Sequence, residues 1–295
     1  MDATLNKPMA ALPVERSPGY WSTVGRRLLR NRLAMLAALI LLALIVMAIF
    51  APALMPADPY ASSILKRLKP IGFAGYPLGT DELGRDMLSR LMLGARLSLF
   101  MGITPVLMAF VLGSAIGIVA GYAGGWTNTI IMRLTDILYA FPSVLLAIAL
   151  SGTLGAGVGN ALLSLTIVFV PQIVRVAESV TTQVRNREFV DAARASGASS
   201  LTIVRAHILN NVLGPIFVYA TSLISVSMIL ASGLSFLGLG VKPPEPEWGL
   251  MLNTLRTAIY VQPWVAALPG AAIFITSISF NLLSDGLRSA MDVKG

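Results

Sequence analysis

The sequence predicts an all-α membrane protein with six transmembrane helices. Of its 295 residues, 56% are hydrophobic and 12% are charged, and its mean hydropathy of +0.77 is high, whereas about a quarter of a soluble domain is charged. A helix needs about twenty apolar residues to cross the ~30 Å hydrocarbon core of a membrane. Runs of about that length cover residues 33–55, 97–120, 129–151, 160–177, 213–236 and 264–283. Because the runs are continuous, they favour a helical bundle over a barrel, whose strands alternate apolar and polar residues.

The chain begins with a polar tail, residues 1–32, followed by the first span at 33–55. Ala51-Pro52-Ala53 has the small-x-small pattern of a signal-peptide cleavage site. However, the apolar run is longer than the 7–15 residues of a signal core, and the leader is too long for its basic region. We therefore expect an uncleaved first helix.

Polar residues and glycines lie just before the second span, within the connecting segment 56–95. Thr80-Asp81 and Gly84-Arg85-Asp86 combine turn glycines with side chains that can accept hydrogen bonds. The first backbone N–H groups of a helix have no partner inside the helix. We expect these side chains to satisfy them.

Within the second and third spans, two patterns predict packing rather than chemistry. Gly113, Gly117, Gly121 and Gly125 recur every four residues and form a smooth strip that lets another helix approach closely. Arg133 and Asp136 are three residues apart, a spacing that brings opposite charges together on one helical face. We expect these two side chains to neutralise each other, although ionisable groups inside spans also occur in ion-coupled carriers.

The fourth and fifth spans are joined by a polar stretch with its own helical pattern. One small, weakly apolar face repeats at helical spacing, over Phe189, Ala192, Ala193 and Ser196. Gly197 should end this helix in the left-handed conformation, and Ser199 or Ser200 should cap a second short helix running toward His207. The alternative is a solvated loop whose periodicity is fortuitous, but such a loop would not need small residues at its turn.

Prolines and one tryptophan characterise the connection before the last span. The run from Pro243 to Trp248 contains three prolines and two glutamates, which predicts a stiff turn outside the hydrocarbon. Tryptophan is enriched where membrane meets water. We expect Trp248 in that interfacial belt.

Basic residues set the expected orientation, because cytoplasmic loops are enriched in Lys and Arg. An even number of spans places both termini on the same side. With that side cytoplasmic, the inner segments carry Lys7, Arg16, Arg26, Arg27, Arg30, Arg32, Arg185, Arg187, Arg194, Arg205, Arg288 and Lys294. The segments assigned outside hold fewer, so both termini are predicted in the cytoplasm.

Several kinds of chemistry are excluded. A single histidine and no cysteine leave no multi-histidine or thiolate metal site and no thiol catalysis. Ser63 and Lys66 match S-x-x-K by chance, since the motifs that accompany it in enzymes are absent. The chain has no G-K dipeptide and hence no phosphate-binding P-loop. No basic patch with interleaved aromatics supports nucleic-acid binding.

The polar stretch carries a resemblance to a known family. Asp191-Ala192-Ala193, Gly197 and Ile208-Leu209 resemble the E-A-A, three residues, G, I-x-L-P signature of permease subunits of bacterial ATP-binding-cassette importers. Asp191 replaces the usual Glu, and Asn210 or Asn211 stands where proline is common. Residues 77–99, 242–252 and 280–295 are more specific, because they resemble the second permease subunit of dipeptide, oligopeptide and nickel importers.

This resemblance implies a type I importer permease fold in a bacterial inner membrane. Residues 96–285 would form the transmembrane domain of five helices, with a cytoplasmic coupling loop at 186–209 and a cytoplasmic tail at 286–295. The implied ATPase-contacting residues are Asp191, Ala192, Ala193, Gly197, Ala198, Ser199, Ile208 and Leu209. The implied partners are a second permease, two ATPase subunits that hold ATP and Mg²⁺, and an extracytoplasmic binding protein that delivers substrate. The turn 243–248 is a candidate contact for this binding protein.

The expected cargo is a dipeptide or oligopeptide, and the chain itself is expected to bind no cofactor and to catalyse no reaction. Alternatives within the family are nickel, opines or another small solute. An autonomous secondary transporter or channel is the alternative from a different class.

Overall fold

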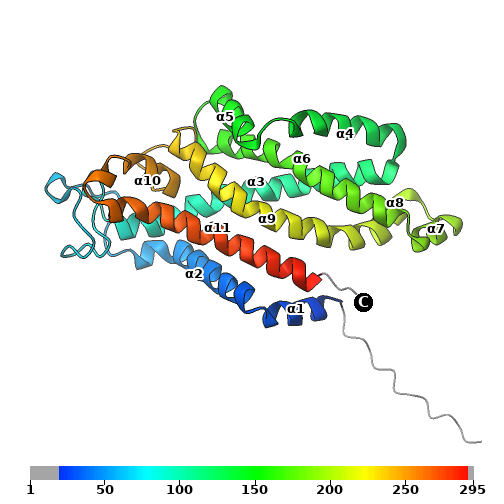
Figure 1. Ribbon diagram of the computed structural model, residues 1–295, viewed down its shortest axis with the longest axis horizontal. Helices are drawn as coiled ribbons and strands as arrows, with labels where there is room; N and C mark the ends of the chain where they lie inside the picture. Colours follow the sequence, from blue (N-terminus) through cyan, green and yellow to red (C-terminus); the bar gives the residue numbers. More distant parts are fainter. Residues whose placement is uncertain (1–19, 292–295) are drawn as a thin grey trace, which may run out of the picture.

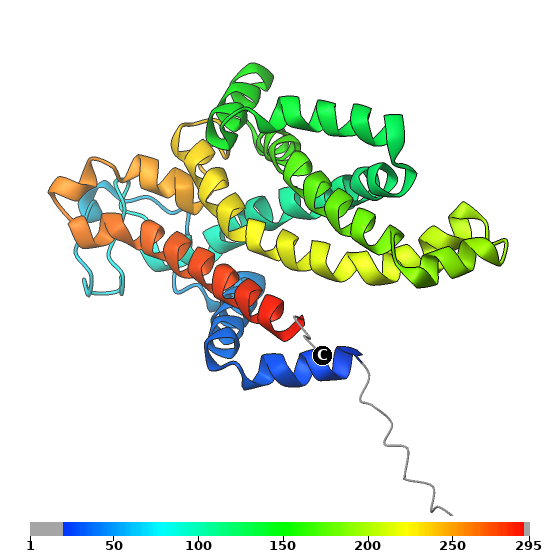
Figure 2. The same ribbon diagram turned by 45° about the vertical axis from the view of Figure 1, so that its right-hand side comes forward.

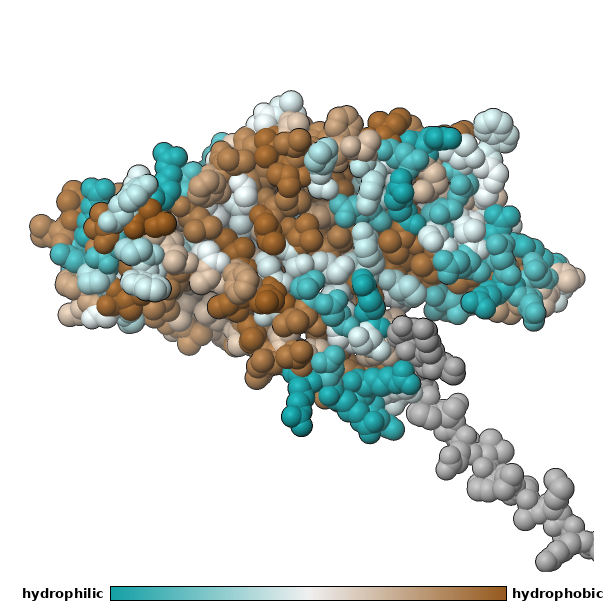
Figure 3. Space-filling view, in the orientation of Figure 1, coloured by the Kyte–Doolittle hydropathy of each residue, from teal (hydrophilic) through white to brown (hydrophobic). Residues whose placement is uncertain are grey.

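The computed structural model describes residues 20–291, which form an elongated bundle of helices lying along one long axis (Figure 1). Within these residues, five helical segments are long and apolar enough to cross a membrane. They are α2 (Arg32–Leu54), α3 (Met87–Ala123), α6 (Val158–Arg185), α9 (Leu209–Phe236) with the helical turns before it, and α11 (Pro263–Met291). Apolar residues cover the middle of the bundle in the space-filling view, and hydrophilic residues gather toward its ends and over α1 (Tyr20–Arg30) (Figure 3).

The expected third span, 129–151, is not one straight helix. It consists of α4 (Gly125–Tyr139) and α5 (Ser143–Leu154), which are bent by 85° at a short break and count as a sixth span only when taken together. Pro142 precedes α5 directly. Because proline has no N–H and disfavours helical geometry in the residue before it, the chain leaves the helix there.

The α2 helix matches the expected first span to within one residue, but α3 and α6 run past the ends of their apolar runs. The α3 helix begins ten residues before the expected 97, because Asp86 caps it by accepting a hydrogen bond from the backbone N–H of Ser89 at 2.7 Å. The α6 helix continues to Arg185 rather than 177. A hydropathy pattern detects the apolar part of a helix, whereas the helix itself ends where its backbone groups find other partners.

Both predicted tails are partly helical. The α1 helix occupies part of the expected tail 1–32, with Leu28 lying against Gly286 of α11. Likewise α11 extends to Met291, well into the expected tail 286–295. Residues 1–19 and 292–295, with Lys7, Arg16 and Lys294, lie outside the described residues.

The glycine strip packs against a helix as predicted, at three of its four positions. A Cβ on Gly113 would lie 2.9 Å from Ile173, one on Gly117 2.6 Å from Ala177, and one on Gly121 2.8 Å from Thr181, all on α6. Gly125 differs, since it begins α4 with a φ of +52° and has open space around it. The strip therefore joins α3 and α6 closely, because only glycine leaves room for the facing backbone.

A proline and an arginine connect α2 to α3. Pro52 lies inside α2 and cannot donate to the carbonyl of Ala48, one turn earlier. Arg96 of α3 donates from Nε to that oxygen at 2.6 Å and from Nη2 to the carbonyl oxygen of Ile49 at 2.6 Å. A side chain from the neighbouring helix thus satisfies the carbonyl that the proline leaves free.

The loop end of the bundle comprises the segment 57–86, the short 3₁₀ helices η1 (Ile64–Lys66) and η3 (Ala258–Tyr260), and α10 (Trp248–Thr254). Here Thr80, Asp81, Arg85 and Asp86 are all buried. Asp81 accepts from the Arg85 side chain at 2.6 Å and from the backbone N–H of Leu83 at 2.9 Å. The expectation that these residues cap the start of the helix is confirmed for Asp86, whereas Asp81 satisfies backbone groups of the turn before it.

Trp248, at the same end of the bundle, does not have the predicted interfacial position. It is only 1% exposed, and its indole N–H donates to the carbonyl of Leu91 at 3.0 Å, so it does not lie in an interfacial belt. Its neighbour Glu247 caps α10 by accepting from the N–H groups of Gly249 and Leu250. Burial raises the pKa of the Glu247 carboxyl, which these hydrogen bonds offset only in part.

Candidate functional site

The polar stretch lies at the α7 end of the bundle, opposite the loop end. The α7 helix (Glu188–Ala195) follows α6 after only two residues and projects beyond the other helices (Figures 1 and 2). A short turn then leads to α8 (Ser200–Ile203). The chain thus makes a helical hairpin at the tip of two long helices, α6 and α9.

The turn at Gly197 has the predicted left-handed conformation, with a φ of +79°. The N–H of Ala198 donates to the carbonyl of Ala193 at 3.1 Å, and the N–H of Gly197 donates to the carbonyl of Arg194 at 3.0 Å. These two bonds form a Schellman motif, which satisfies the last carbonyls of a helix and needs a positive φ at one residue. Gly197 supplies it without a steric cost.

Ser199 caps the second helix, as predicted, by accepting from the N–H of Thr202 at 3.3 Å. This helix runs toward His207 as predicted but does not end there, because α8 continues through a π-helical turn, η2 (Val204–Ile208), directly into α9. Asn211 donates from its side chain to the carbonyl of His207 at 2.6 Å, where a proline would have interrupted the helix. The second arm of the hairpin is therefore continuous with a membrane-spanning helix.

Three apolar side chains anchor the hairpin. Val190, Ile203 and Ile208 are at most 1% exposed and belong to the main apolar core. Of these, sequence reasoning singled out only Ile208. Val190 and Ile203 belong to short apolar groups on the two sides of a polar turn, which is the signal that could have found them.

The remaining predicted residues divide between the outer surface of the hairpin and its contact with the core. Asp191, Ala192, Gly197 and Ser199 are exposed, Ala193 and Ala198 are partly buried, and Leu209 packs against the core. Asp191 forms an ion pair with Arg194 at 3.0 Å that is itself exposed to solvent. Two large apolar side chains flank these small residues, with Phe189 42% and Leu201 67% exposed. An exposed surface of small and apolar residues, held by a buried anchor, can dock against a groove in another protein.

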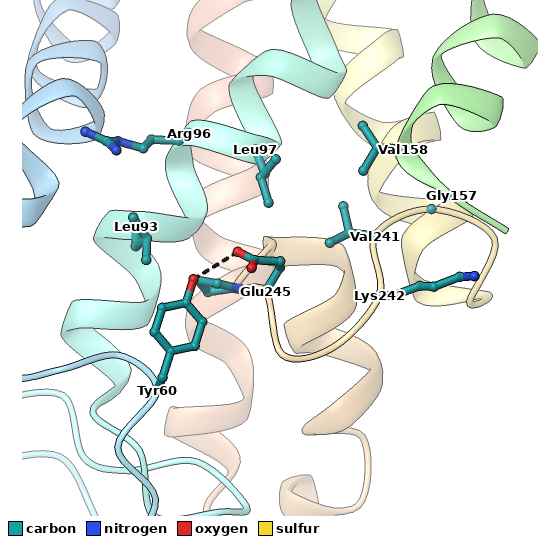
Figure 4. Close-up of a pocket in the computed structure, with 11 residues that line it drawn as sticks. Tyr60, Leu93, Arg96, Leu97, Gly157, Val158, Val241, Lys242 and Glu245 are labelled. Carbon is teal, nitrogen blue, oxygen red and sulfur yellow. Dashed lines mark hydrogen bonds between the residues drawn. The ribbon is translucent and has the colours of Figure 1, made fainter.

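The loop end carries a cavity of about 500 Å³ (Figure 4). Tyr60 donates from its hydroxyl to Glu245 Oε2 at 2.9 Å beside it, and Leu97, Val158 and Val241 supply apolar walls. Sequence reasoning did not find this cavity, because its walls come from segments that lie far apart in the chain.

Comparison with known proteins places the chain in a family. Residues 113–294 match the family model described as binding-protein-dependent transport system inner membrane component. Residues 19–70 match the N-terminal transmembrane domain of oligopeptide transport permease C. The first match covers the glycine strip, the hairpin and the last span.

Curated relatives are similar over nearly the whole chain. A glutathione transport system permease protein, GsiD, of Pectobacterium atrosepticum is 42% identical over 97% of this chain and 96% of its own length. Its counterpart in Escherichia coli O157:H7 is 41% identical over 99% and 96%.

A solved structure has the same fold. It is an inward-facing conformation of the MetNI methionine ABC transporter, with a TM-score of 0.58 at 18% identity over 69% of this chain and 97% of that one. The fold is thus that of a type I importer permease, and the chain is a multi-pass transport subunit rather than an enzyme. On the strength of the family match and these relatives, the chain belongs to the inner-membrane components of binding-protein-dependent transport systems.

Proposed function

We propose that this chain pairs with a second, homologous permease to import small peptides, glutathione among them. The names of the relatives support the cargo, since they transport glutathione and are more than 40% identical along almost the entire chain. The match to an oligopeptide permease domain over residues 19–70 supports the same class.

The hairpin transmits the energy of ATP hydrolysis. The residues proposed to meet the ATPase subunits are Asp191, Ala192, Ala193, Gly197, Ala198 and Ser199, with Ile208 and Leu209 fixing the second arm to the core. One observation carries this proposal: the exposed hairpin is continuous with α9 and separated from α6 by only two residues. A force on the hairpin therefore moves both spans together, as a rigid-body switch between inward-facing and outward-facing states requires.

ATP and Mg²⁺ are assigned to the ATPase partners, since the sequence contains no P-loop. The α7 end of the bundle faces the cytoplasm, to which both termini are also assigned, and the loop end faces the binding protein. The exposed Arg26, Arg27 and Arg30 of α1 support this orientation. Pro243, Pro244 and Glu245, exposed at the loop end, are the proposed contact for the binding protein.

Reconstitution tests the function. Vesicles that contain both permeases and both ATPase subunits, supplied with the binding protein, should take up labelled glutathione or dipeptide only with ATP. The purified chain alone should show no ATP turnover above background. Uptake of nickel or an opine in place of any peptide would change the assigned cargo. ATP turnover that persists without any ATPase subunit would end the importer-subunit proposal.

A further inference from the structure

An ion pair lies on the surface between two of the spans. Arg175 of α6 donates from Nη2 to Asp136 Oδ1 of α4 at 2.6 Å, which corrects the expected pairing of Asp136 with Arg133. The Arg175 guanidinium also lies over the ring of Tyr139, 4.6 Å from its centroid. Both charged side chains remain accessible, at 45% and 43% exposure.

A cavity of about 350 Å³ adjoins this pair at the break between α4 and α5. Tyr139, Pro142 and Ser143 line one wall, and Gln172 lines the other, one turn before Arg175 on α6. Pro171 precedes Gln172 and cannot donate to the helical carbonyl one turn earlier. The cavity is therefore lined by the α4–α5 break and by the Gln172 amide, and the ion pair lies beside it, with Arg175 stacked on Tyr139 of the lining.

Contact with lipid is unfavourable for a surface that carries charged side chains and unpaired backbone groups. Arg175 lies at the edge of the apolar run 160–177, about 15 Å along α6 from the end of that helix at 1.5 Å per residue. Half-exposed charges and interrupted backbone inside a membrane occur where the surface lines a water-filled passage or another protein. The cavity beside Asp136 and Arg175 favours the passage that two permeases would enclose over a packed protein contact.

We propose that Asp136, Gln172 and Arg175 bind the transported peptide as a zwitterion, an inference that rests on the proposed import of peptides. Arg175 takes the peptide carboxylate, because a guanidinium matches a carboxylate with two parallel N–H groups. Asp136 takes the ammonium group, and the Gln172 amide meets the peptide backbone. A half-exposed ion pair contributes little stability of its own, so its two halves can exchange partners with a zwitterion. The cavity falls within the usual range for small-ligand sites.

The test measures the KM for uptake in vesicles that contain the complete importer. The substrates are one dipeptide with free termini, its C-terminal amide and its N-acetyl form. Arg175→Gln should raise the KM for the free dipeptide about tenfold, as expected for one lost charged hydrogen bond. It should also abolish the preference for a free carboxylate over the amide. Asp136→Asn should likewise abolish the preference for a free amine. Arg133→Gln, an exposed arginine on α4, is the control and should change neither KM nor the ATPase rate.

Exchanging the two charged residues distinguishes a substrate-binding role of the ion pair from a purely structural one. Asp136→Arg combined with Arg175→Asp keeps an ion pair but presents the charges in reverse order. We expect assembly at normal membrane levels and a raised KM. A normal KM in this double variant would overturn the proposal, because the pair would then be structural. So would loss of the second permease from Arg175→Gln at an unchanged KM, since the face would then be a permease interface. If the wild-type complex imports no peptide at all, the proposed function fails first.

Discussion

At the scale of single residues, Gly197 is the most informative position in the hairpin. Its φ is +79°, yet a Cβ there would meet no atom within 4 Å. Any cost of substitution therefore comes from the backbone conformation and not from crowding. Asparagine tolerates the left-handed region. For alanine the left-handed backbone conformation is about 1–2 kcal/mol less favourable, and for a β-branched residue the difference is larger.

Substitutions of Gly197 should therefore form a graded series. Coupling of ATP hydrolysis to uptake should fall in the order Gly, Asn, Ala, Val, with Gly197→Val near zero and membrane levels close to normal. The measurement is uptake alongside ATPase rate in vesicles that contain the complete importer. Normal transport and coupling by Gly197→Val would show that the hairpin does not couple the two processes.

Two neighbouring positions provide a contrast. Asp191→Glu should be tolerated, because the exposed carboxylate keeps its charge near Arg194. Ala193→Trp should impair uptake, because a bulky ring blocks close approach on the small-residue face. Both variants are compared with wild type in the same uptake assay. Equal uptake by the two would contradict the assigned docking face.

Arg96 and Pro52 form a pair that a double-mutant cycle can test. Arg96→Leu leaves the carbonyl of Ala48 without a donor and should destabilise the chain by about 1.5–3 kcal/mol, the range for hydrogen bonds to charged groups. Pro52→Ala restores a backbone N–H, so the loss of Arg96 should cost less in that background. Thermal unfolding in detergent measures both effects. Additive effects would mean that the arginine does not compensate for the proline.

At the scale of helices, the contact of α3 with α6 depends on the absence of side chains. A Cβ on Gly117 would lie 2.6 Å from both the Cβ of Ala177 and the carbonyl oxygen of Val174, whereas one on Gly233 of α9 would meet nothing within 4 Å. Replacing glycine by alanine at each of these two positions therefore separates the effect of helix packing from the effect of helix propensity.

Gly117→Ala should destabilise the chain by about 1–3 kcal/mol, the usual cost of overpacking. Gly233→Ala should be neutral or stabilising by up to about 1 kcal/mol, because alanine restricts the unfolded chain. The apparent melting temperatures of the purified variants compare the two. Equal melting temperatures would mean that the helices can separate at Gly117 without cost.

At the scale of the whole molecule, orientation is the property to test. The chain contains no cysteine, so each introduced thiol is unique. Ile71→Cys at the loop end should react with a membrane-impermeant reagent added outside, since Ile71 is 47% exposed. Ser200→Cys in the hairpin should react only after the membrane is permeabilised. The opposite labelling pattern would reverse the assigned orientation.

Features with local causes can be predicted from the order of the residues alone. The length and apolarity of the runs predict membrane spans, and the small residues of 189–200 predict a helix, a left-handed stop at Gly197 and a cap at Ser199. Each of these depends on residues only a few positions apart, so the sequence pattern contains all the interacting groups. The resemblance of residues 191–209 to importer permeases points to the same stretch.

The contacts between groups far apart in the chain depend on how the helices pack. Asp136 pairs with Arg175, thirty-nine positions away, in preference to Arg133 on its own helix. Trp248 is buried against Leu91 and not placed in an interfacial belt, because α3 passes beside α10. Such partners are set by how whole helices pack, and hydropathy along the chain does not encode a choice between two polar partners of similar chemistry. The proposed peptide site at the α4–α5 break is of this kind, since its charges come together only when α4 and α6 lie side by side.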